Sequence, residues 1–138
     1  MSSRLVQTAS TRALFSALFL VAALFAANST ARPAPEAKVL NHVVLFKFSP
    51  DATPEKIKQV EDAFRALPSK ITEIRSFEWG TNVSHEGLSD GFTHCFHLTF
   101  ASEKDRDAYL VHPAHKAFGE MLGSSLAKVT VVDFWAQK

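Results

Sequence analysis

The chain has 138 residues, of which 46% are hydrophobic and 11% aromatic, and its formal net charge at pH 7 is +1. This length fits one globular domain, and the aromatic content and low charge exclude an intrinsically disordered chain. With 15 basic against 14 acidic residues, the composition argues against nucleic-acid binding through bulk positive charge. The single cysteine, Cys95, cannot form an intrachain disulfide.

The N-terminal segment has the pattern of a targeting signal. Residues 1–31 contain Arg4 and Arg12, no acidic residue, and an apolar run over 13–27. A basic head, a short apolar run and small residues after it are typical of a secretory signal peptide, and the run falls short of the about 20 residues of a membrane span. We predict a signal peptide over 1–31, cleaved before Arg32, and export to the periplasm or the extracellular space. The alternatives are a mitochondrial transit peptide and an uncleaved membrane anchor, and only the anchor would make the membrane a partner.

The remaining chain is expected to be a linker over 32–38 and a domain over 39–138. The linker contains two prolines and few apolar residues, which favours an extended conformation. Within the domain, residues 39–48 are rich in β-branched and aromatic residues and predict a strand. Thr53 followed by proline, and then apolar residues at three- and four-residue steps, predict a helix over 54–67.

The second half of the domain predicts a similar series of elements. A second strand is expected within 71–83, and the alternation of residues 92–100 predicts a third. Ser102, with an aspartate three residues later, is a capping signal for a second helix, and Pro113 is expected to interrupt that helix. Residues 129–135 predict the last strand.

The order strand, helix, strand, strand, helix, strand is that of the ferredoxin-like α+β fold (βαββαβ). Two helices cover only one face of a four-stranded sheet, yet the strands over 39–48 and 129–135 are apolar on both faces. A sheet with two apolar faces needs a second cover. We therefore predict a symmetric homodimer in which a second copy supplies that cover.

Histidines are the candidates for chemistry, because the chain lacks a glycine-rich phosphate loop, paired cysteines and a serine nucleophile motif. His42 and His94 each interrupt an apolar strand face, and we expect both to enter the interior that the helices cover. Together with Phe46, Phe92 and Phe96 they predict an aromatic-lined ligand pocket with a few polar groups. The alternative is two core histidines that are hydrogen-bonded by their neighbours.

A second cluster, Tyr109, His112 and His115, lies at the predicted break in the helix. The spacing of the two histidines could suit a metal, but no cysteine or carboxylate is placed to complete a site, so we predict neither a metal nor a cofactor. The cluster favours acid–base chemistry, with His115 accepting a proton and Tyr109 orienting it or the substrate. The alternative is a plain helix end with His115 in solvent. His97 is expected at the dimer interface.

Four segments together carry a family resemblance: HVVLFKF at 42–48, RSFEWGTNVS at 75–84, GFTHCFHLTFAS at 91–102 and YLVHPAHKAF at 109–118. They resemble the stress-responsive dimeric α/β-barrel (Dabb) domain, over residues 40–135. The resemblance implies a ferredoxin-like protomer and a dimer whose two sheets close a barrel, in agreement with the argument from strand faces.

One member of the Dabb family is a plant polyketide cyclase that works without a cofactor, by an aldol-type ring closure with a histidine base and a supporting tyrosine. The resemblance places the base on His115, its support on Tyr109, and two further pocket histidines on His42 and His94. Phe64 stands where that cyclase has a pocket tyrosine, so a hydroxyl is missing here. Most members of the family have no known activity beyond stress induction.

Three functions are therefore compared. The first is an exported, homodimeric stress-responsive protein that binds a small apolar or aromatic ligand without turnover. The second is a cofactor-independent lyase or cyclase in which His115 abstracts a proton, Tyr109 orients, and His42 and His94 polarise a carbonyl. The third, a cofactor-free monooxygenase, rests on fold analogy alone. Export favours the first, because a cyclase that works beside a cytosolic synthase is not expected outside the cell.

Overall fold

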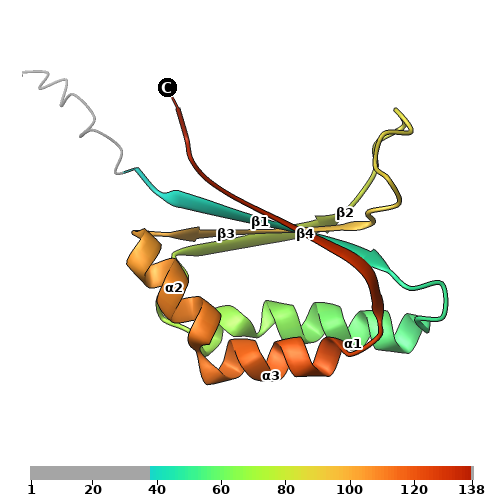
Figure 1. Cartoon of the computed structure of the whole chain (residues 1–138), viewed down its shortest axis with the longest axis horizontal. Helices are drawn as coiled ribbons and strands as arrows, with labels where there is room; N and C mark the ends of the chain where they lie inside the picture. The colour runs from blue at the N-terminus through green and yellow to red at the C-terminus, as the bar shows by residue number, and fades with distance from the viewer. Residues whose placement is uncertain (1–37, 138) are drawn as a thin grey trace, which may run out of the picture. The chain divides into compact units, whose positions relative to one another are not determined.

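The structure, a computed structural model, describes residues 38–137. The predicted signal peptide, and all of the predicted linker except residue 38, lie outside the described residues. A layer of helices covers one face of a four-stranded antiparallel sheet (Figure 1). Between residues 38 and 137, no helix is long and apolar enough to cross a membrane.

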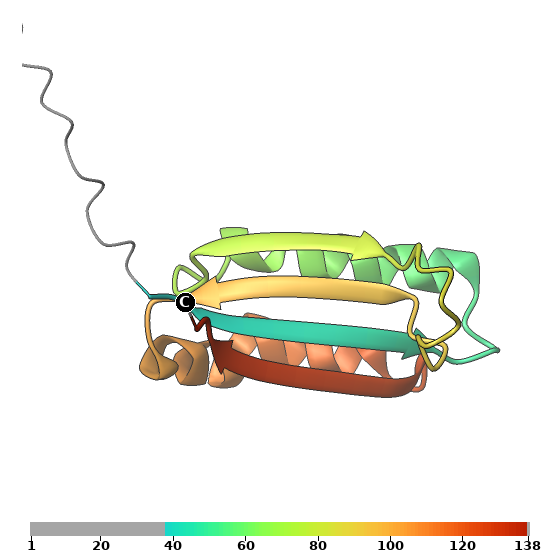
Figure 2. The ribbon, with the colours of Figure 1, turned by 90° about the horizontal axis from the view of Figure 1, so that it is seen from above.

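The sheet brings the two ends of the domain together. Its strands are β1 (Leu40–Phe48), β2 (Ser76–Thr81), β3 (His94–Phe100) and β4 (Leu126–Trp135). Their order across the sheet is β2-β3-β1-β4, so β1 lies between β3 and β4 while β2 and β4 form the edges (Figure 2). Every neighbouring pair is antiparallel. This is the ferredoxin-like α+β fold that the order of elements predicted.

The first helix, α1 (Pro54–Arg65), begins at the predicted position. The Oγ1 atom of Thr53 accepts a hydrogen bond of 3.2 Å from the backbone N–H of Lys56, which satisfies one of the free N–H groups of the first turn. The helix ends two residues before the end of the predicted range 54–67. A short 3₁₀ helix, η1 (Leu67–Ser69), follows it, because proline at position 68 disfavours the α conformation in the residue before it.

The predicted interruption at Pro113 is confirmed, and it produces two separate helices. The helix α2 (Glu103–Val111) starts at Ser102, whose Oγ accepts from the N–H of Asp105 at 3.1 Å. His112 then has extended backbone angles (φ −62°, ψ 138°), ends α2, and caps α3 (Pro113–Leu122) by accepting the N–H of Ala114 on its Nδ1 at 3.1 Å. The chain therefore changes direction between Tyr109 and the residues of α3.

Two strand boundaries differ from the prediction. The third strand begins at His94 instead of residue 92, because the N–H of Phe92 donates to the carbonyl of Ser89 at 2.9 Å and keeps Phe92 in the preceding turn. The last strand begins at Leu126, three residues before the predicted start, because its first residues continue the pairing with the end of β1 across an irregularity in the register.

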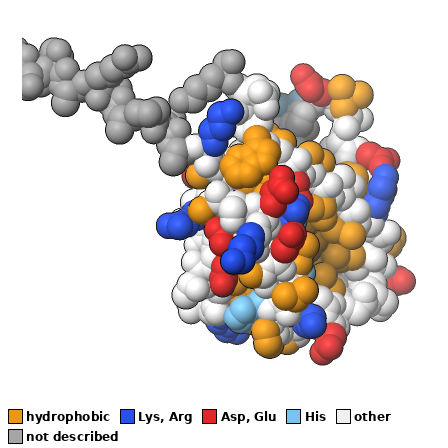
Figure 3. All heavy atoms as spheres, turned by 60° about the vertical axis from the view of Figure 1, so that its left-hand side comes forward, with side chains coloured by type: hydrophobic (Ala, Val, Ile, Leu, Met, Phe, Trp, Pro, Cys, Tyr) orange, Lys and Arg blue, Asp and Glu red, His pale blue; other side chains and the backbone are white. Residues whose placement is uncertain are grey.

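The core lies between the sheet and the helices, and the opposite face of the sheet is open. The largest fully buried side chains are Phe46, Phe64, Leu67, Ile71, Phe96, Leu98, Phe100, Tyr109 and Val60. On the opposite face, Val132 and Phe134 remain 50% and 44% exposed, and no other segment within residues 38–137 covers them. The first and last strands, β1 and β4, are therefore apolar on both faces, as predicted. The end of the domain that carries α2 instead mixes acidic, basic and hydrophobic side chains (Figure 3).

Candidate functional site

A cavity of about 250 Å³ lies between the sheet and the helices α2 and α3, next to the edge strand β4. Most of its lining is apolar, and the aromatic side chains Phe46, Phe64 and Phe118 form what we call the aromatic wall. His42, Tyr109 and His115 bring polar atoms to the same space. Two larger hollows lie at the loops, one between residues 49–56 and 122–125 and one beneath residues 80–92, but neither combines a tyrosine with two histidines.

His42 enters the cavity from the centre of the sheet. It is paired in register with Asp133 of β4, and its Nδ1 lies 2.5 Å from Oδ1 of that carboxylate. Since a carboxylate only accepts, Nδ1 of His42 carries the hydrogen. The side chain of His42 is only 4% exposed. Its other nitrogen, Nε2, has no hydrogen-bond partner among residues 38–137, so Nε2 is free to meet a ligand.

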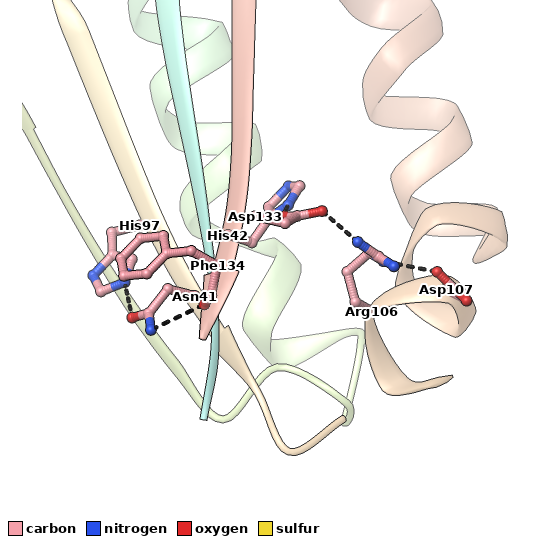
Figure 4. Close-up of polar contacts among 7 residues, drawn as sticks. All are labelled: Asn41, His42, His97, Arg106, Asp107, Asp133 and Phe134. Carbon is pink, nitrogen blue, oxygen red and sulfur yellow. Dashed lines mark hydrogen bonds and ion pairs between the residues drawn. The ribbon is translucent and has the colours of Figure 1, made fainter. Parts of the chain in front are cut away.

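Asp133 is held from its other side by α2. Its Oδ2 accepts a hydrogen bond from Nη1 of Arg106, and Nε of Arg106 donates to Oδ1 of Asp107 at 2.7 Å (Figure 4). The two oxygens of Asp133 therefore have different partners, an imidazole on the sheet and a guanidinium on a helix. A chain of charged hydrogen bonds runs from the surface of α2 to the polar side of the cavity.

Tyr109 lies between the two histidines. Its ring centroid is 4.3 Å from that of His115 and 5.6 Å from that of His42. The tyrosine residue is 1% exposed, yet its hydroxyl has no partner among the described residues. Because no fully buried side-chain nitrogen or oxygen within 38–137 lacks a partner, the hydroxyl must border open space, which is the cavity. Burial raises the pKa of Tyr109, so the phenol keeps its proton and acts as a donor.

His115 has the properties of a base. Its Nδ1 lies 3.1 Å from the carbonyl oxygen of Leu110, which can only accept, so Nδ1 carries the hydrogen and Nε2 has the lone pair. Burial lowers the pKa of His115; the bond to Leu110 acts in the opposite direction, and the neighbouring His42 adds to the lowering. At neutral pH the imidazole is uncharged, and its Nε2 can accept a proton.

His94 faces the same layer but does not reach the cavity. It pairs in register with Phe46, whereas His42 pairs with Leu98, four residues along β3. Both of its nitrogens have partners, Nε2 with Oε1 of Glu61 at 3.0 Å and Nδ1 with Oγ1 of Thr93 at 2.8 Å. The structure thus places His94 in the core as a hydrogen-bonded histidine, and the expected union of the two histidines in one pocket does not occur.

The predicted phenylalanines are divided in the same way. Phe46 and Phe64 line the cavity, whereas Phe96 lies behind Phe64, with the two ring centroids 4.2 Å apart. Phe92 lies in the hollow beneath residues 80–92, where the ammonium group of Lys128 is 5.4 Å from its ring. Of the predicted site residues, the structure therefore brings together His42, Phe46, Phe64, Tyr109 and His115, and leaves His94, Phe92 and Phe96 outside.

Two charged residues of the site were not predicted. Asp133 is an acidic residue within an apolar strand, a position at which aspartate is depleted, and this signal in the sequence VTVVDFW could have indicated it. Arg106 gives no comparable signal, because an arginine on a short helix is usually in solvent. Within the described part of the chain, no three His, Cys, Asp or Glu side chains come together as a metal site.

Comparison with known proteins decides the family. The sequence profile of the Stress responsive A/B Barrel Domain matches residues 40–136. The chain belongs to this family. Among its relatives is the stress-response A/B barrel domain-containing protein HS1 of Arabidopsis thaliana, which is 38% identical over 95 residues, 69% of this chain and 87% of HS1.

Two further proteins that this chain resembles bear on function and assembly. Olivetolic acid cyclase of Cannabis sativa is 26% identical over 99 residues, 72% of this chain and 98% of the cyclase. The crystal structure of a dimeric ferredoxin-like protein of unknown function from Thermobifida fusca is 26% identical, with a TM-score of 0.62 over 73% of this chain and 93% of that chain. The proteins similar to this chain thus include one named as an enzyme and one dimer of unknown function.

Proposed function

We propose that this chain is a homodimer that binds a compact apolar or aromatic molecule carrying one oxygen function in the cavity beside β4. The observation that supports the proposal is the meeting of three polar groups with free hydrogen-bonding capacity in a mostly apolar space, beside the paired carboxylate of Asp133. The hydroxyl of Tyr109 and the Nε2 atoms of His42 and His115 have no hydrogen-bond partner among residues 38–137. Small-molecule sites combine an apolar lining with a few polar groups in this way.

The size of the cavity limits the ligand. Its volume of about 250 Å³ is below the roughly 300–1,000 Å³ of pockets for drug-sized molecules. The aromatic wall closes it on the side of His94, since Phe64 is 1% exposed and its ring centroid is 4.8 Å from that of Phe118. A single ring with a short substituent is the size of ligand that this space favours.

Binding is tested with three probes of nearly equal shape. Acetophenone has a carbonyl oxygen, 1-phenylethanol has a hydroxyl, and ethylbenzene has neither. With the full chain, calorimetry should show tighter binding of the two oxygenated probes, by about three- to tenfold for one net hydrogen bond. Tyr109→Phe should reduce this advantage for acetophenone while ethylbenzene binds as before. If none of the three probes binds, the proposed site is wrong.

The dimer is proposed from the open face of the sheet. Val132 and Phe134 are half exposed there, and in the register of β1 and β4 Val132 lies beside Val43 and Phe134 beside Asn41. A second copy of the same face would bury this apolar surface, and dimeric relatives of the same fold support the proposal. Val132→Lys should convert the dimer to a monomer in light scattering. Val111→Lys, at an exposed position on α2, is the control and should stay dimeric; a monomeric wild type would refute the dimer.

A second candidate function, proton abstraction, is favoured by the state of His115. His115 and Tyr109 both line the cavity, and Nε2 of His115 has no hydrogen-bond partner among residues 38–137. Nε2 would take a proton from a carbon next to a ligand carbonyl, and the C–H electron pair would form an enolate whose oxygen accepts from Tyr109. The enolate carbon could then attack a second carbonyl, and His115 would return the proton to the new alkoxide. The relationship to olivetolic acid cyclase supports this candidate.

Exchange of the methyl protons of acetophenone for deuterium distinguishes binding from turnover. A catalytic base would accelerate the exchange above that in buffer, and His115→Gln would abolish the acceleration. Binding without accelerated exchange would leave the chain as a binding protein. Export remains part of the proposal, supported by the sequence of residues 1–31; the N-terminus of the isolated protein is expected at Arg32, and an intact N-terminus would favour the membrane anchor.

A further inference from the structure

We propose that Arg106 is a positioning residue of this site, which acts through Asp133 to hold the His42 ring with Nε2 facing the cavity. The inference rests on the proposed function, since it gives a role to a residue that does not itself line the cavity. It assigns the charged chain on α2 to ligand recognition as well as to the attachment of that helix to the sheet.

Each carboxylate oxygen of Asp133 has a hydrogen-bond partner of its own. Oδ1 accepts from His42 at 2.5 Å and Oδ2 accepts from Arg106. The guanidinium is itself fixed, because its Nε donates to Asp107 at 2.7 Å (Figure 4). With both oxygens engaged, the carboxylate plane has little freedom to rotate, although the terminal torsion of an aspartate is otherwise broad. The orientation of the carboxylate then sets the orientation of the imidazole.

The need for Arg106 follows from where Asp133 lies. It is on the edge strand β4, and its side chain is 27% exposed, compared with 4% for His42 and 20% for Arg106. Without the guanidinium, water can compete for the carboxylate and draw it away from the sheet. His42 would then lose the only partner that its Nδ1 has among residues 38–137, and a buried imidazole without a partner rotates toward another one. The cavity would lose a fixed Nε2.

The position of Arg106 on its helix agrees with this role. Arg106 and Tyr109 are three residues apart on α2 and so share one face of that helix. One face of α2 therefore supplies both a hydroxyl to the cavity and the charge that fixes the opposite wall. A displacement of α2 relative to β4 would change both polar groups together.

The test compares two probes that differ by one hydroxyl. The hydroxyl of 1-phenylethanol can donate or accept, so it meets Nε2 of His42 in either protonation state, and ethylbenzene has the same shape without it. In the full chain, Arg106→Met should reduce the ratio of the two affinities by about three- to tenfold, the value of one net hydrogen bond, with ethylbenzene unchanged. Arg106→Lys keeps the charge and should restore part of the ratio. Arg75→Met, at an exposed arginine without a side-chain hydrogen bond or ion pair within residues 38–137, should have no effect.

A second readout does not depend on the ligand. The ring ¹⁵N signals of His42 should shift in Arg106→Met and return toward wild type in Arg106→Lys, while those of His94 stay unchanged. An unchanged affinity ratio, or an equal weakening of both probes, would overturn the positioning role. If the wild type binds neither probe, the proposed function fails, and unchanged His42 signals in Arg106→Met would then separately overturn the inference.

Discussion

Replacement of Phe64 should couple the stability of the domain to the size of its ligand. Phe64 is 1% exposed, and its ring centroid lies 4.2 Å from that of Phe96 and 4.8 Å from that of Phe118. Truncation of such a ring to alanine costs about 3–5 kcal/mol of unfolding free energy. A domain of this size has about 5–15 kcal/mol in total, so Phe64→Ala is expected to be close to unfolding, and Phe64→Leu is the more useful variant.

Urea unfolding gives the first measurement. We expect Phe64→Leu to lower the free energy of unfolding by about 1–2 kcal/mol, in the range of core substitutions that keep most of the volume. Phe77→Leu is the matched control. Phe77 is only partly buried, its ring centroid is 5.6 Å from that of Phe64, and it does not line the cavity. Phe77→Leu should lower the free energy of unfolding by less than Phe64→Leu does. An equal loss in both variants would show that the aromatic wall does not depend on Phe64.

Ligand binding gives the second measurement, with acetophenone, propiophenone and butyrophenone as probes of increasing length. Each methylene that finds room is worth about 0.8 kcal/mol, or about fourfold in affinity. The affinity of the wild type should not increase from acetophenone to the longer ketones, since the aromatic wall ends the cavity. Phe64→Leu should bind propiophenone more tightly than acetophenone. A wild type that binds each longer ketone about fourfold more tightly would refute the wall as the limit of the site.

Two predictions concern titration. Tyr109 is the only tyrosine, so absorbance of phenolate reports on it alone; because burial raises its pKa above the ordinary 10.0, we expect no ionisation at pH 10 in the folded chain. The free energy of unfolding should fall as pH rises above 10, since only the unfolded chain then releases the phenol proton. A phenolate absorbance with a midpoint at pH 10 would contradict the burial of Tyr109. The pKa of His115 is lowered from 6.5, so below pH 6.5 the unfolded chain takes up a proton first and the free energy of unfolding falls as pH falls. His115→Gln should show a shallower decline in urea titrations between about pH 7 and 5, and identical slopes would place His115 in solvent.

Local sequence patterns predicted the elements because they act over a few residues. The capping signals at Thr53 and Ser102 and the break at Pro113 are properties of neighbouring backbone groups, and each lies where it was expected. The error at Phe92 has the same origin: the alternation of apolar residues continues through it, but a turn hydrogen bond to Ser89 holds it out of the strand.

The site was less predictable, because alternation along a strand assigns a side chain to a face and says nothing of its position along that face. His42 and His94 share a face, yet the register separates them by four residues of β3, about 13 Å at the rise of a strand. The pair Val44 and Phe96 lies between them in the register. The proximity of Tyr109 and His115 depends in turn on how α2 and α3 meet at the break.

By itself, the sequence determined the order of the elements, the covered and open faces of the sheet, and the identity of the residues that could act as acids or bases. These follow from periodicity and from side-chain chemistry, which do not require knowledge of distant segments. The tertiary structure decided which of those residues meet. It placed Asp133 opposite His42 and Arg106 beside Asp133, although 91 residues separate the first pair and 27 the second. Contacts at such separations are set by strand register and helix packing, which depend on the whole domain.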